Sequence, residues 1–239
     1  LVVSCGPRGG PVTPLFLFFF PRDFPVFFFF FTDRNELDIC NEDDIKNFVN
    51  NNNINTIVNC AAYTAVDKAE NDEVNADKIN HLAVKYLSEI SKEKSIKLIN
   101  ISTDYVFDGK NGPYSEDDSS NPINVYGKTK LAGERAVQEY GGNWCILRTN
   151  VLFDYYNNTE ASFIKWIIDS LKLNKPVNVV DDQWNNPTWT QNLAEIIELV
   201  INKNVTGFYN YGGADYINRF EFAKIIADIF NLDKTLILP

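Results

Sequence analysis

The chain has 239 residues, enough for one large domain or for one domain with a smaller second lobe. With 45% hydrophobic and 23% charged residues, its composition is typical of a soluble globular protein. The formal net charge of −10 argues against nucleic acid as a partner, because binding to a phosphate backbone needs a basic surface. An anionic small ligand stays compatible with this charge, since backbone amides and one or two cations can bind a phosphate locally.

Cysteine and histidine usage indicates a compartment and disfavours some chemistries. The cysteines Cys5, Cys40, Cys60 and Cys145 lie far apart with no CxxC pair, and His81 is the single histidine. Such a set leaves little from which to build a zinc site or a His-based triad, so no metal is expected. Scattered cysteines indicate a reducing, cytoplasmic compartment. His81 falls within a helical pattern and is interpreted as a residue of the helix surface.

The phenylalanine-rich segment 16–31 does not have the pattern of a membrane span. A transmembrane helix needs about 20 consecutive apolar residues, whereas two prolines, an arginine and an aspartate interrupt this segment. A signal peptide would need a basic start and small residues at its end, which do not fit this sequence either. The sequence therefore predicts no association with a membrane.

Short apolar runs alternate with helical patterns along the chain. The predicted strands, in chain order, are 1–3, 26–31, 55–59, 95–102, 144–147 and 177–180. The predicted helices are 75–91, 125–140, 163–171, 193–201 and 220–230. This alternation predicts βαβ units and an α/β fold with a doubly wound parallel sheet of the Rossmann type. In such a sheet, ligands bind beyond the carboxyl ends of the strands, so the loops there are expected to carry the chemistry.

Two glycines near the start fit a phosphate-binding turn. Gly6 and Gly9 follow the apolar run 1–3, where they would let the backbone approach a pyrophosphate at a helix N-terminus. The expected third glycine falls where Val12 stands, so an ordinary Gly/Pro-rich loop is the alternative.

A charged pair follows the second predicted strand. At its end stand Asp33 and Arg34. An acid at this place binds adenosine ribose hydroxyls, whereas an arginine suits a 2′-phosphate, so NAD and NADP both stay open. The alternative reading of the pair is the start of a turn or helix.

The reaction centre is predicted from two further segments. Thr103, Asp104 and Tyr105 directly follow the apolar run 95–102, although such residues are also common in turns. Tyr126 and Lys130 are four residues apart in a helical pattern and therefore share one helix face. A lysine near a phenol lowers the phenol pKa from its usual value of about 10, which makes the tyrosine a proton donor near neutral pH. An ordinary exposed Tyr and Lys are the alternative.

Together, these segments resemble the dTDP-4-dehydrorhamnose reductase family of extended short-chain dehydrogenases. The likeness runs from about Asp33 to the end, in order and with sensible spacing. It is carried by VNCAAYTAVDKAE at 58–70, STDYVFDG at 102–109, PINVYGKTKLAGE at 122–134, LRT at 147–149, VDDQ at 180–183, NPT at 186–188 and NRFEFA at 218–223.

The resemblance implies an architecture and a reaction. Residues 1–150 would form an NAD(P)-binding Rossmann core, and 151–239 mainly a substrate lobe with returning core elements. Relatives continue beyond the position of Pro239, so part of that lobe is expected to be absent. The implied reaction is hydride transfer from NADPH or NADH to C4 of a nucleotide-linked 4-keto sugar, as in dTDP-rhamnose biosynthesis. A homodimer stays open.

The resemblance also implies residue roles. Tyr126 would protonate the developing alkoxide, Lys130 would hold the nicotinamide ribose and depress the Tyr126 pKa, and Thr103 would hydrogen-bond the carbonyl oxygen. The residues implied to bind the cofactor are Gly6, Gly9, Asp33, Arg34, Asp38, Ile39, Ala61, Ala62, Tyr63, Tyr126, Lys130 and Thr149. The residues implied to bind the substrate are Asp104, Tyr105, Val151 and Arg219.

One departure from the family and two alternatives bear on the substrate. Val151 stands where rhamnose-forming relatives usually carry a tryptophan, which leaves the exact sugar open. Dehydratases of the superfamily typically have an acid pair after the active-site threonine, whereas here Asp104 is followed by Tyr105; this disfavours a dehydratase or epimerase. The regulatory subunit of methionine adenosyltransferase has a Val-Leu-Tyr stretch similar to 151–153, so a non-catalytic role is the second alternative. The intact set of Thr103, Tyr126 and Lys130 favours the reductase.

Overall fold

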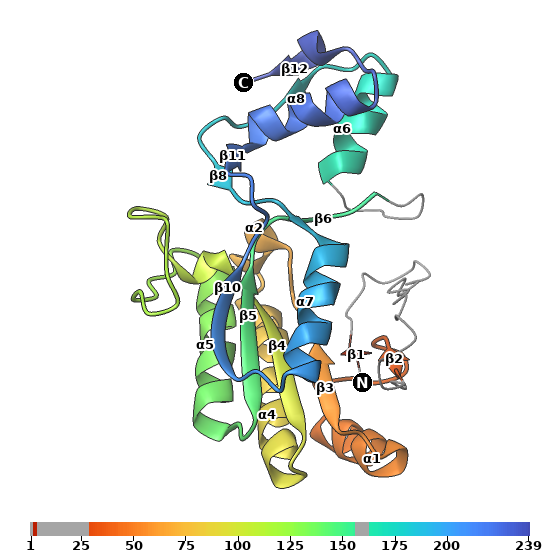
Figure 1. Cartoon of the computed structure of the whole chain (residues 1–239), viewed down its shortest axis with the longest axis vertical. Coiled ribbons are helices and arrows are strands. Elements are labelled where there is room, and N and C mark those ends of the chain that lie inside the picture. The colour runs from red at the N-terminus through yellow and green to blue at the C-terminus, as the bar shows by residue number, and fades with distance from the viewer. Residues whose placement is uncertain (1, 4–28, 156–162) are drawn as a thin grey trace. The chain divides into compact units, whose positions relative to one another are not determined.

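A computed structural model describes residues 2–3, 29–155 and 163–239 of the chain. The chain divides into two compact units (Figure 1). The first unit consists of Leu1–Arg148 and Ile197–Asn210, and the second of Thr149–Ile196 and Tyr211–Pro239. Each unit therefore contains two separate segments of the chain.

The first unit is built on a six-stranded sheet of order β10-β5-β4-β3-β1-β2. β1 pairs in parallel with β2 and with β3, and β3 pairs in parallel with β4. The strands are β1 (Val2–Val3), β2 (Phe31–Thr32), β3 (Thr56–Asn59), β4 (Lys97–Thr103), β5 (Trp144–Thr149) and β10 (Gly207–Tyr211). The predicted Rossmann-type α/β fold is confirmed.

The strand order reverses between β1 and β3. The chain continues from β1 to β2 on one side, and β3 then lies on the other side of β1. Ligands of such sheets bind outside the carboxyl ends of the strands at this reversal. The segment that follows β3 there is 60–63, and the segment that follows β4 is 104–106.

Helices cover the sheet of the first unit, and α4 and α5 pack against each other and against β4 (Figure 1). The α-helices that lie wholly in this unit are α1 (Glu42–Asn52), α2 (Val66–Ala69), α3 (Glu73–Asp77), α4 (Ala83–Glu93) and α5 (Val125–Tyr140). Between α3 and α4 lies a π-helical turn, η1 (Lys78–Leu82), and a 3₁₀ turn, η2 (Asp104–Val106), follows β4. The α7 helix (Thr190–Asn202) begins in the second unit and ends in the first.

The two helices predicted for the first unit are present, but a π-turn and one further helix were not predicted. The predicted helix 125–140 matches α5, and 75–91 falls within the continuous helical run 73–93. The π-turn inside that run was not predicted, because the apolar spacing does not show one inserted residue. The α1 helix was also missed, although Asn41 caps it and three acidic residues fill its first turn, both of which favour a helix start.

The core of the first unit is aliphatic. Ile57 on β3, Leu98 on β4 and Ile146 on β5 are almost completely buried, as expected for strands covered on both faces. Ile45 from α1 and Leu87 from α4 pack into the same cluster. This rigid layer supports the loops at the carboxyl ends of the strands.

The second unit has a core of its own. Ile167 and Ile168 of α6 and Ala223 and Ala227 of α8 are buried within it. Its elements are β6 (Leu152–Phe153), α6 (Phe163–Lys172), β7 (Val177–Asn178), β8 (Trp184–Asn185), β9 (Thr188–Trp189), β11 (Ile217–Asn218), α8 (Arg219–Ile229), η3 (Lys234–Leu236) and β12 (Ile237–Leu238). They include three two-stranded sheets, β11-β8, β12-β7 and β6-β9. Across the described residues of both units, no helix is long and apolar enough to cross a membrane.

Candidate functional site

The three residues predicted to be catalytic gather at the carboxyl end of β4. Thr103 is the last residue of this strand, and its hydroxyl lies beside the phenol of Tyr126. Tyr126 lies in the first turn of α5, where the Asn124 side chain caps the helix by accepting from the Gly127 amide at 2.7 Å. One helical turn later, Lys130 Nζ donates to the Ile101 carbonyl oxygen at 2.7 Å. The pairing of α5 with the end of β4 thus brings together segments that the sequence separates by more than twenty residues.

Asp104 and Tyr105, predicted to contact the substrate, lie beside the same phenol. The Tyr105 and Tyr126 rings meet edge to face, with centroids 5.5 Å apart and an interplanar angle of 77°. Tyr105 is 36% exposed, whereas Thr103 is only 5% exposed, so the centre is open on the side of Tyr105 and closed on the side of the strand. The Thr103 hydroxyl donates its hydrogen to Asp104 Oδ1 at 3.1 Å.

The predicted lowering of the Tyr126 pKa is wrong for the chain by itself. Burial raises the pKa of this phenol to about 12, and the negative charge of Asp104 adds to the rise, while the neighbouring Thr103 hydroxyl opposes it. Burial disfavours the phenolate more than any neighbour favours it. The sequence spacing placed Lys130 correctly on the same face of the helix, but it carried no information on how deeply the phenol is buried.

Lys130 responds to burial in the opposite direction. Desolvation lowers the pKa of its ammonium to about 8, and the carboxylate of Glu134 partly opposes this effect. Cys60, in the loop after β3, lies near enough for the two groups to interact electrostatically, although burial raises the pKa of its thiol to about 11. At neutral pH both the Tyr126 phenol and the Lys130 ammonium therefore hold their protons.

The buried side-chain amide of Asn80, which the sequence did not predict as a site residue, fixes the segments that surround Lys130. Asn80, in the π-turn η1, accepts from the Tyr63 amide at 2.8 Å through Oδ1 and donates through Nδ2 to the Tyr63 carbonyl at 3.2 Å and to Thr129 Oγ1 at 3.1 Å. It thereby ties the loop after β3 to α5 at the residue next to Lys130. Gly133 permits this close approach, because a Cβ there would clash with the Asn80 backbone oxygen. Asn80 could have been noticed in the sequence as a polar amide within an apolar helical pattern.

A buried ion pair lies one turn beyond Lys130. Glu134 of α5 is 1% exposed, and Arg148 of β5 donates to it through Nη2 at 2.7 Å and through Nε at 3.0 and 3.2 Å. Ser102 of β4 donates to Glu134 Oε1 at 2.5 Å. The Arg148 guanidinium lies over the rings of Phe107 and Phe208, at 5.2 and 4.6 Å from their centroids. No pattern in the sequence predicted a role for Glu134.

The residues predicted to bind the cofactor near β2 lie in a tight turn. Asp33 Oδ1 accepts from the amides of Asn35 and Glu36, at 2.7 and 3.2 Å, so this carboxylate stabilises its own turn. Arg34 is exposed in that turn. Asp38 is half-buried and accepts from the Cys40 amide at 3.0 Å, and Ile39 is buried. Gly6 and Gly9 lie outside the described residues.

The predicted cofactor residues after β3 lie at the reversal of strand order. Ala61 is 2% exposed, and its amide donates to Asn59 Oδ1 at 3.2 Å. Asn59 in turn donates to Asn100 of the neighbouring strand β4 at 2.8 Å. Ala62 and Tyr63 are half-buried, and the Tyr63 hydroxyl donates to Asp72 at 3.1 Å. Buried amides in two adjacent strands thus fix the backbone of this loop.

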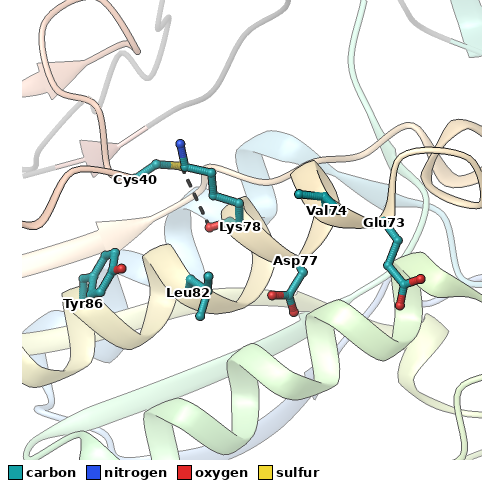
Figure 2. A pocket seen from close by; sticks show the side chains of 7 residues that line it. All are labelled: Cys40, Glu73, Val74, Asp77, Lys78, Leu82 and Tyr86. Carbon is teal, nitrogen blue, oxygen red and sulfur yellow. Dashed lines mark hydrogen bonds between the residues drawn. The ribbon is translucent and has the colours of Figure 1, made fainter.

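A pocket of about 490 Å³ lies beside the helical run 73–93 (Figure 2). Figure 2 shows Cys40 across from the helical residues, with the Cys40 thiol directed at the Lys78 carbonyl. The residues lining the pocket are Cys40, Glu73, Val74, Asp77, Lys78, Leu82 and Tyr86. None of the three predicted catalytic residues lines it, but Cys40 directly follows Asp38 and Ile39.

The remaining predicted site residues belong to the second unit. Thr149 is buried, and its hydroxyl has no hydrogen-bond partner among the described residues. Val151 has a φ of +37°, a strained conformation for a β-branched residue, and its carbonyl accepts from the Thr188 amide at 3.1 Å. Arg219 begins α8, where its guanidinium lies 5.1 Å from the centroid of the Phe163 ring.

Within the described ranges, no cluster of three or more His, Cys, Asp or Glu is placed to hold a metal ion. His81 is half-buried on the helical run, where its Nδ1 lies 2.9 Å from Asp77 Oδ1.

The known proteins that resemble this chain include reductases and a subunit of methionine adenosyltransferase. A sequence model described as the RmlD substrate binding domain matches residues 27–239. A dTDP-4-keto-6-deoxy-D-glucose reductase of Streptomyces niveus is 35% identical over 208 residues, which cover 86% of this chain and 71% of the relative. Methionine adenosyltransferase 2 subunit beta of Bos taurus is 35% identical over 189 residues, which cover 77% of this chain and 57% of the relative.

A solved structure shares the whole fold. The dTDP-4-dehydrorhamnose reductase of Bacillus anthracis, crystallised in complex with NADP, superposes with a TM-score of 0.88 at 32% sequence identity. The match covers 100% of this chain and 83% of that chain.

Proposed function

This chain belongs to the dTDP-4-dehydrorhamnose reductase family, and from that premise we propose that it reduces the 4-keto group of a nucleotide-linked deoxysugar with NADPH or NADH. The observation that carries the proposal is the meeting of Thr103, Tyr126 and Lys130 at the carboxyl end of β4. The crystallised relative that binds NADP and the relative named as a sugar reductase support it.

Two features of the chain fit a nicotinamide nucleotide. Lys130 Nζ can donate three hydrogen bonds, and among the described residues it has one acceptor, the Ile101 carbonyl. The Thr149 hydroxyl is buried without a partner among the same residues, although buried hydroxyls are normally paired. Lys130 and Tyr126 would hold the nicotinamide ribose, and Thr149 would contact the nicotinamide side of the site. A bound reduced nicotinamide would supply the hydride.

The chain's own residues would handle the proton. As C4 of the sugar accepts a hydride, its carbonyl oxygen gains the electron pair of the C=O bond and becomes an alkoxide. Tyr126 would donate its phenolic proton to this oxygen, which completes the alcohol and leaves a phenolate. Its raised pKa keeps the phenol protonated until that moment. The positive charge of Lys130 would then stabilise the phenolate, and the Thr103 hydroxyl would hold the carbonyl oxygen in line.

The adenosine end of the cofactor would lie near the turn after β2. Asp33, Arg34, Asp38 and Ile39 come from the segment that follows β2, and Cys40, which lines the pocket, directly follows Ile39. The loop 61–63 would border the cofactor between the two ends. For the sugar, we assign Asp104 and Tyr105 of the first unit, and the family resemblance assigns Val151 and Arg219 of the second. Three free cysteines among the described residues support a cytoplasmic location, where thiols stay reduced.

One specific observation favours a second candidate function. The bovine methionine adenosyltransferase 2 subunit beta is as similar in sequence, at 35% identity, as the reductase from Streptomyces niveus. In addition, Val151 stands where a tryptophan is usual in rhamnose-forming relatives. A regulatory subunit that binds the nucleotide without turnover is therefore the alternative to test.

The test compares wild type with Tyr126→Phe in the oxidation of NADPH by a dTDP-4-keto-6-deoxy sugar. Loss of the proton donor should lower kcat by about 10²–10⁴-fold. The dissociation constant of NADPH, measured by fluorescence titration, should change little because the ring is retained. Tyr140→Phe, at the end of the same helix, is the matched control and should keep full turnover. A wild type that binds NADPH but turns over no keto-sugar nucleotide contradicts the reductase and favours the regulatory subunit.

A further inference from the structure

The last three residues of β4 each contact a different turn of α5. The Thr103 hydroxyl lies beside the Tyr126 phenol, the Ile101 carbonyl accepts from Lys130, and the Ser102 hydroxyl donates to Glu134. The three helix residues are spaced by four, so they follow one face of α5. Glu134 is thus the third member of a contact row whose first two members form the proposed reaction centre.

Glu134 is held more firmly than either of the other two. Its carboxylate is 1% exposed and accepts from Ser102 at 2.5 Å and from two nitrogens of Arg148, the shortest of these at 2.7 Å. The Arg148 guanidinium in turn packs against the rings of Phe107 and Phe208. The network joins α5, β4 and β5, so the position of the charge is set by three elements of the fold.

The buried ion pair of Glu134 and Arg148 is poorly explained by a contribution to the stability of the fold. Removing two charges from water is costly, and replacing a buried ion pair by apolar residues is often neutral or even stabilising. A fixed buried charge has its largest effect on other charges nearby, because the surrounding dielectric is low. The next charged group along the helix face is the Lys130 ammonium, one turn away.

Among the groups around Lys130, Glu134 is the carboxylate that stabilises its positive charge. The loop after β3 contributes the Cys60 thiol, which stays neutral because burial raises its pKa to about 11. The preceding turn of α5 contributes the Tyr126 phenol, whose pKa is about 12. β4 contributes a carbonyl and a hydroxyl, and the β5 cation Arg148 is paired with Glu134. Burial opposes the charge on Lys130, and Glu134 favours it.

We propose that Glu134 is a positioning residue of the reaction centre: held by Ser102 and Arg148, it supplies the fixed negative charge behind the Lys130 ammonium and sets the register of α5 against the end of β4. The inference rests on the proposed reductase function. Lys130 needs its positive charge to stabilise the phenolate that Tyr126 leaves after proton transfer, and Glu134 keeps that charge in place during this step.

The test measures the titration of Lys130 directly, in the cofactor-free protein. Protein carrying ¹³C-labelled lysine is titrated by NMR, and the Lys130 signal is assigned as the one that disappears in Lys130→Met. In Glu134→Gln, which keeps the shape and removes the charge, the proton affinity of Lys130 should fall by about tenfold or more. Lys97→Met removes a buried charge at the other end of β4 and should leave the Lys130 titration unchanged.

A second variant covers the case in which Glu134→Gln fails to fold because Arg148 loses its partner. The double variant Glu134→Gln/Arg148→Met removes both charges and should lower the proton affinity of Lys130 in the same direction, by a smaller factor. A wild-type midpoint for Lys130 in either folded variant overturns the proposal.

A kinetic readout separates this proposal from the reductase function. In Glu134→Gln, the fall in kcat at high pH should move to lower pH, which a purely structural defect would not cause. If wild type turns over no keto-sugar nucleotide, the reductase function fails, whereas the NMR titration still decides whether Glu134 acts on Lys130.

Discussion

Two lysines of the first unit are buried close to β4, one at each end of the strand, and they are bonded very differently. Lys97, the first residue of β4, donates to Asn143 Oδ1 at 3.3 Å, to Asn204 Oδ1 at 3.2 Å and to the Val205 carbonyl at 2.6 Å. Lys130, on α5, donates to the Ile101 carbonyl near the other end of the strand. Burial lowers the pKa of both ammonium groups.

The number of hydrogen-bond acceptors distinguishes a structural lysine, Lys97, from Lys130, which can still donate to a ligand. An ammonium has three hydrogens, and Lys97 has an acceptor for each of them, so this side chain ties β4 to the segment that leads into β10. Lys130 has one acceptor among the described residues and lies beside Tyr126 at the carboxyl end of the sheet. Burial and residue type are the same in the two cases, and the number of acceptors differs.

The largest expected effect comes from Lys130→Met. The variant removes the positive charge that stabilises the Tyr126 phenolate and the donor that would hold the nicotinamide ribose. We expect kcat/KM for the keto-sugar nucleotide to fall by about 10²–10⁴-fold and the affinity for NADPH to weaken. Steady-state kinetics and fluorescence titration measure these two quantities. Unchanged kcat/KM in the variant would remove Lys130 from the mechanism.

Lys97→Met should reverse the pattern. It removes a donor that three oxygen atoms share, so the free energy of unfolding in urea should fall by about 1–3 kcal/mol, while turnover per folded molecule stays at the wild-type level. Lys130→Met should be at least as stable as wild type, because it removes a desolvated charge that has a single hydrogen bond. If Lys97→Met loses turnover and keeps its stability, the distinction between the two lysines is wrong.

Gly133→Ala tests the packing that holds α5 behind Lys130. A Cβ at Gly133 would clash with the backbone oxygen of Asn80, and this rigid backbone contact must give way. We expect a loss of about 1–3 kcal/mol in the free energy of unfolding, as for other overpacked sites. The matched control is Gly142→Ala, where the nearest atom to the new Cβ lies at 3.6 Å and the effect should stay within about 0.5 kcal/mol. Equal stability of the two variants would show that α5 can move away from η1.

The last expected effect is on the pH dependence of stability. Burial lowers the Lys130 pKa from 10.5 to about 8, so between these values the unfolded chain binds more protons than the folded chain. The contribution of Lys130 to the free energy of unfolding should therefore rise with pH from about 8 to 10.5. Subtracting the urea unfolding curves of Lys130→Met from those of wild type isolates this contribution. A flat difference across the window would show that Lys130 titrates at its ordinary pKa.

The local features of the site could be predicted from the sequence. The helix 125–140 follows from its apolar spacing, and the four-residue step from Tyr126 to Lys130 places both side chains on one face. Thr103 could be placed at a strand end because an apolar run stops directly before it. Each of these inferences depends on neighbours within a few residues.

The contacts that define the environment of the site could not be predicted in the same way. Asn80 meets Tyr63 and Thr129 across 17 and 49 residues, and Lys97 meets Val205 across 108. The acceptor for Lys130 is a backbone carbonyl, which any residue at position 101 would supply. The rise of the Tyr126 pKa depends on how deeply α5 is covered by other elements, which no spacing within α5 contains.

The most direct test of the central claim follows the hydride itself. NADPH carrying deuterium at the transferred position of the nicotinamide is incubated with wild type and a dTDP-4-keto-6-deoxy sugar, and the sugar is recovered and examined by NMR and mass spectrometry. The account predicts one deuterium at C4 of the product for each NADPH consumed, with transfer lost in Tyr126→Phe. A sugar recovered unlabelled, from protein that binds NADPH, would contradict it.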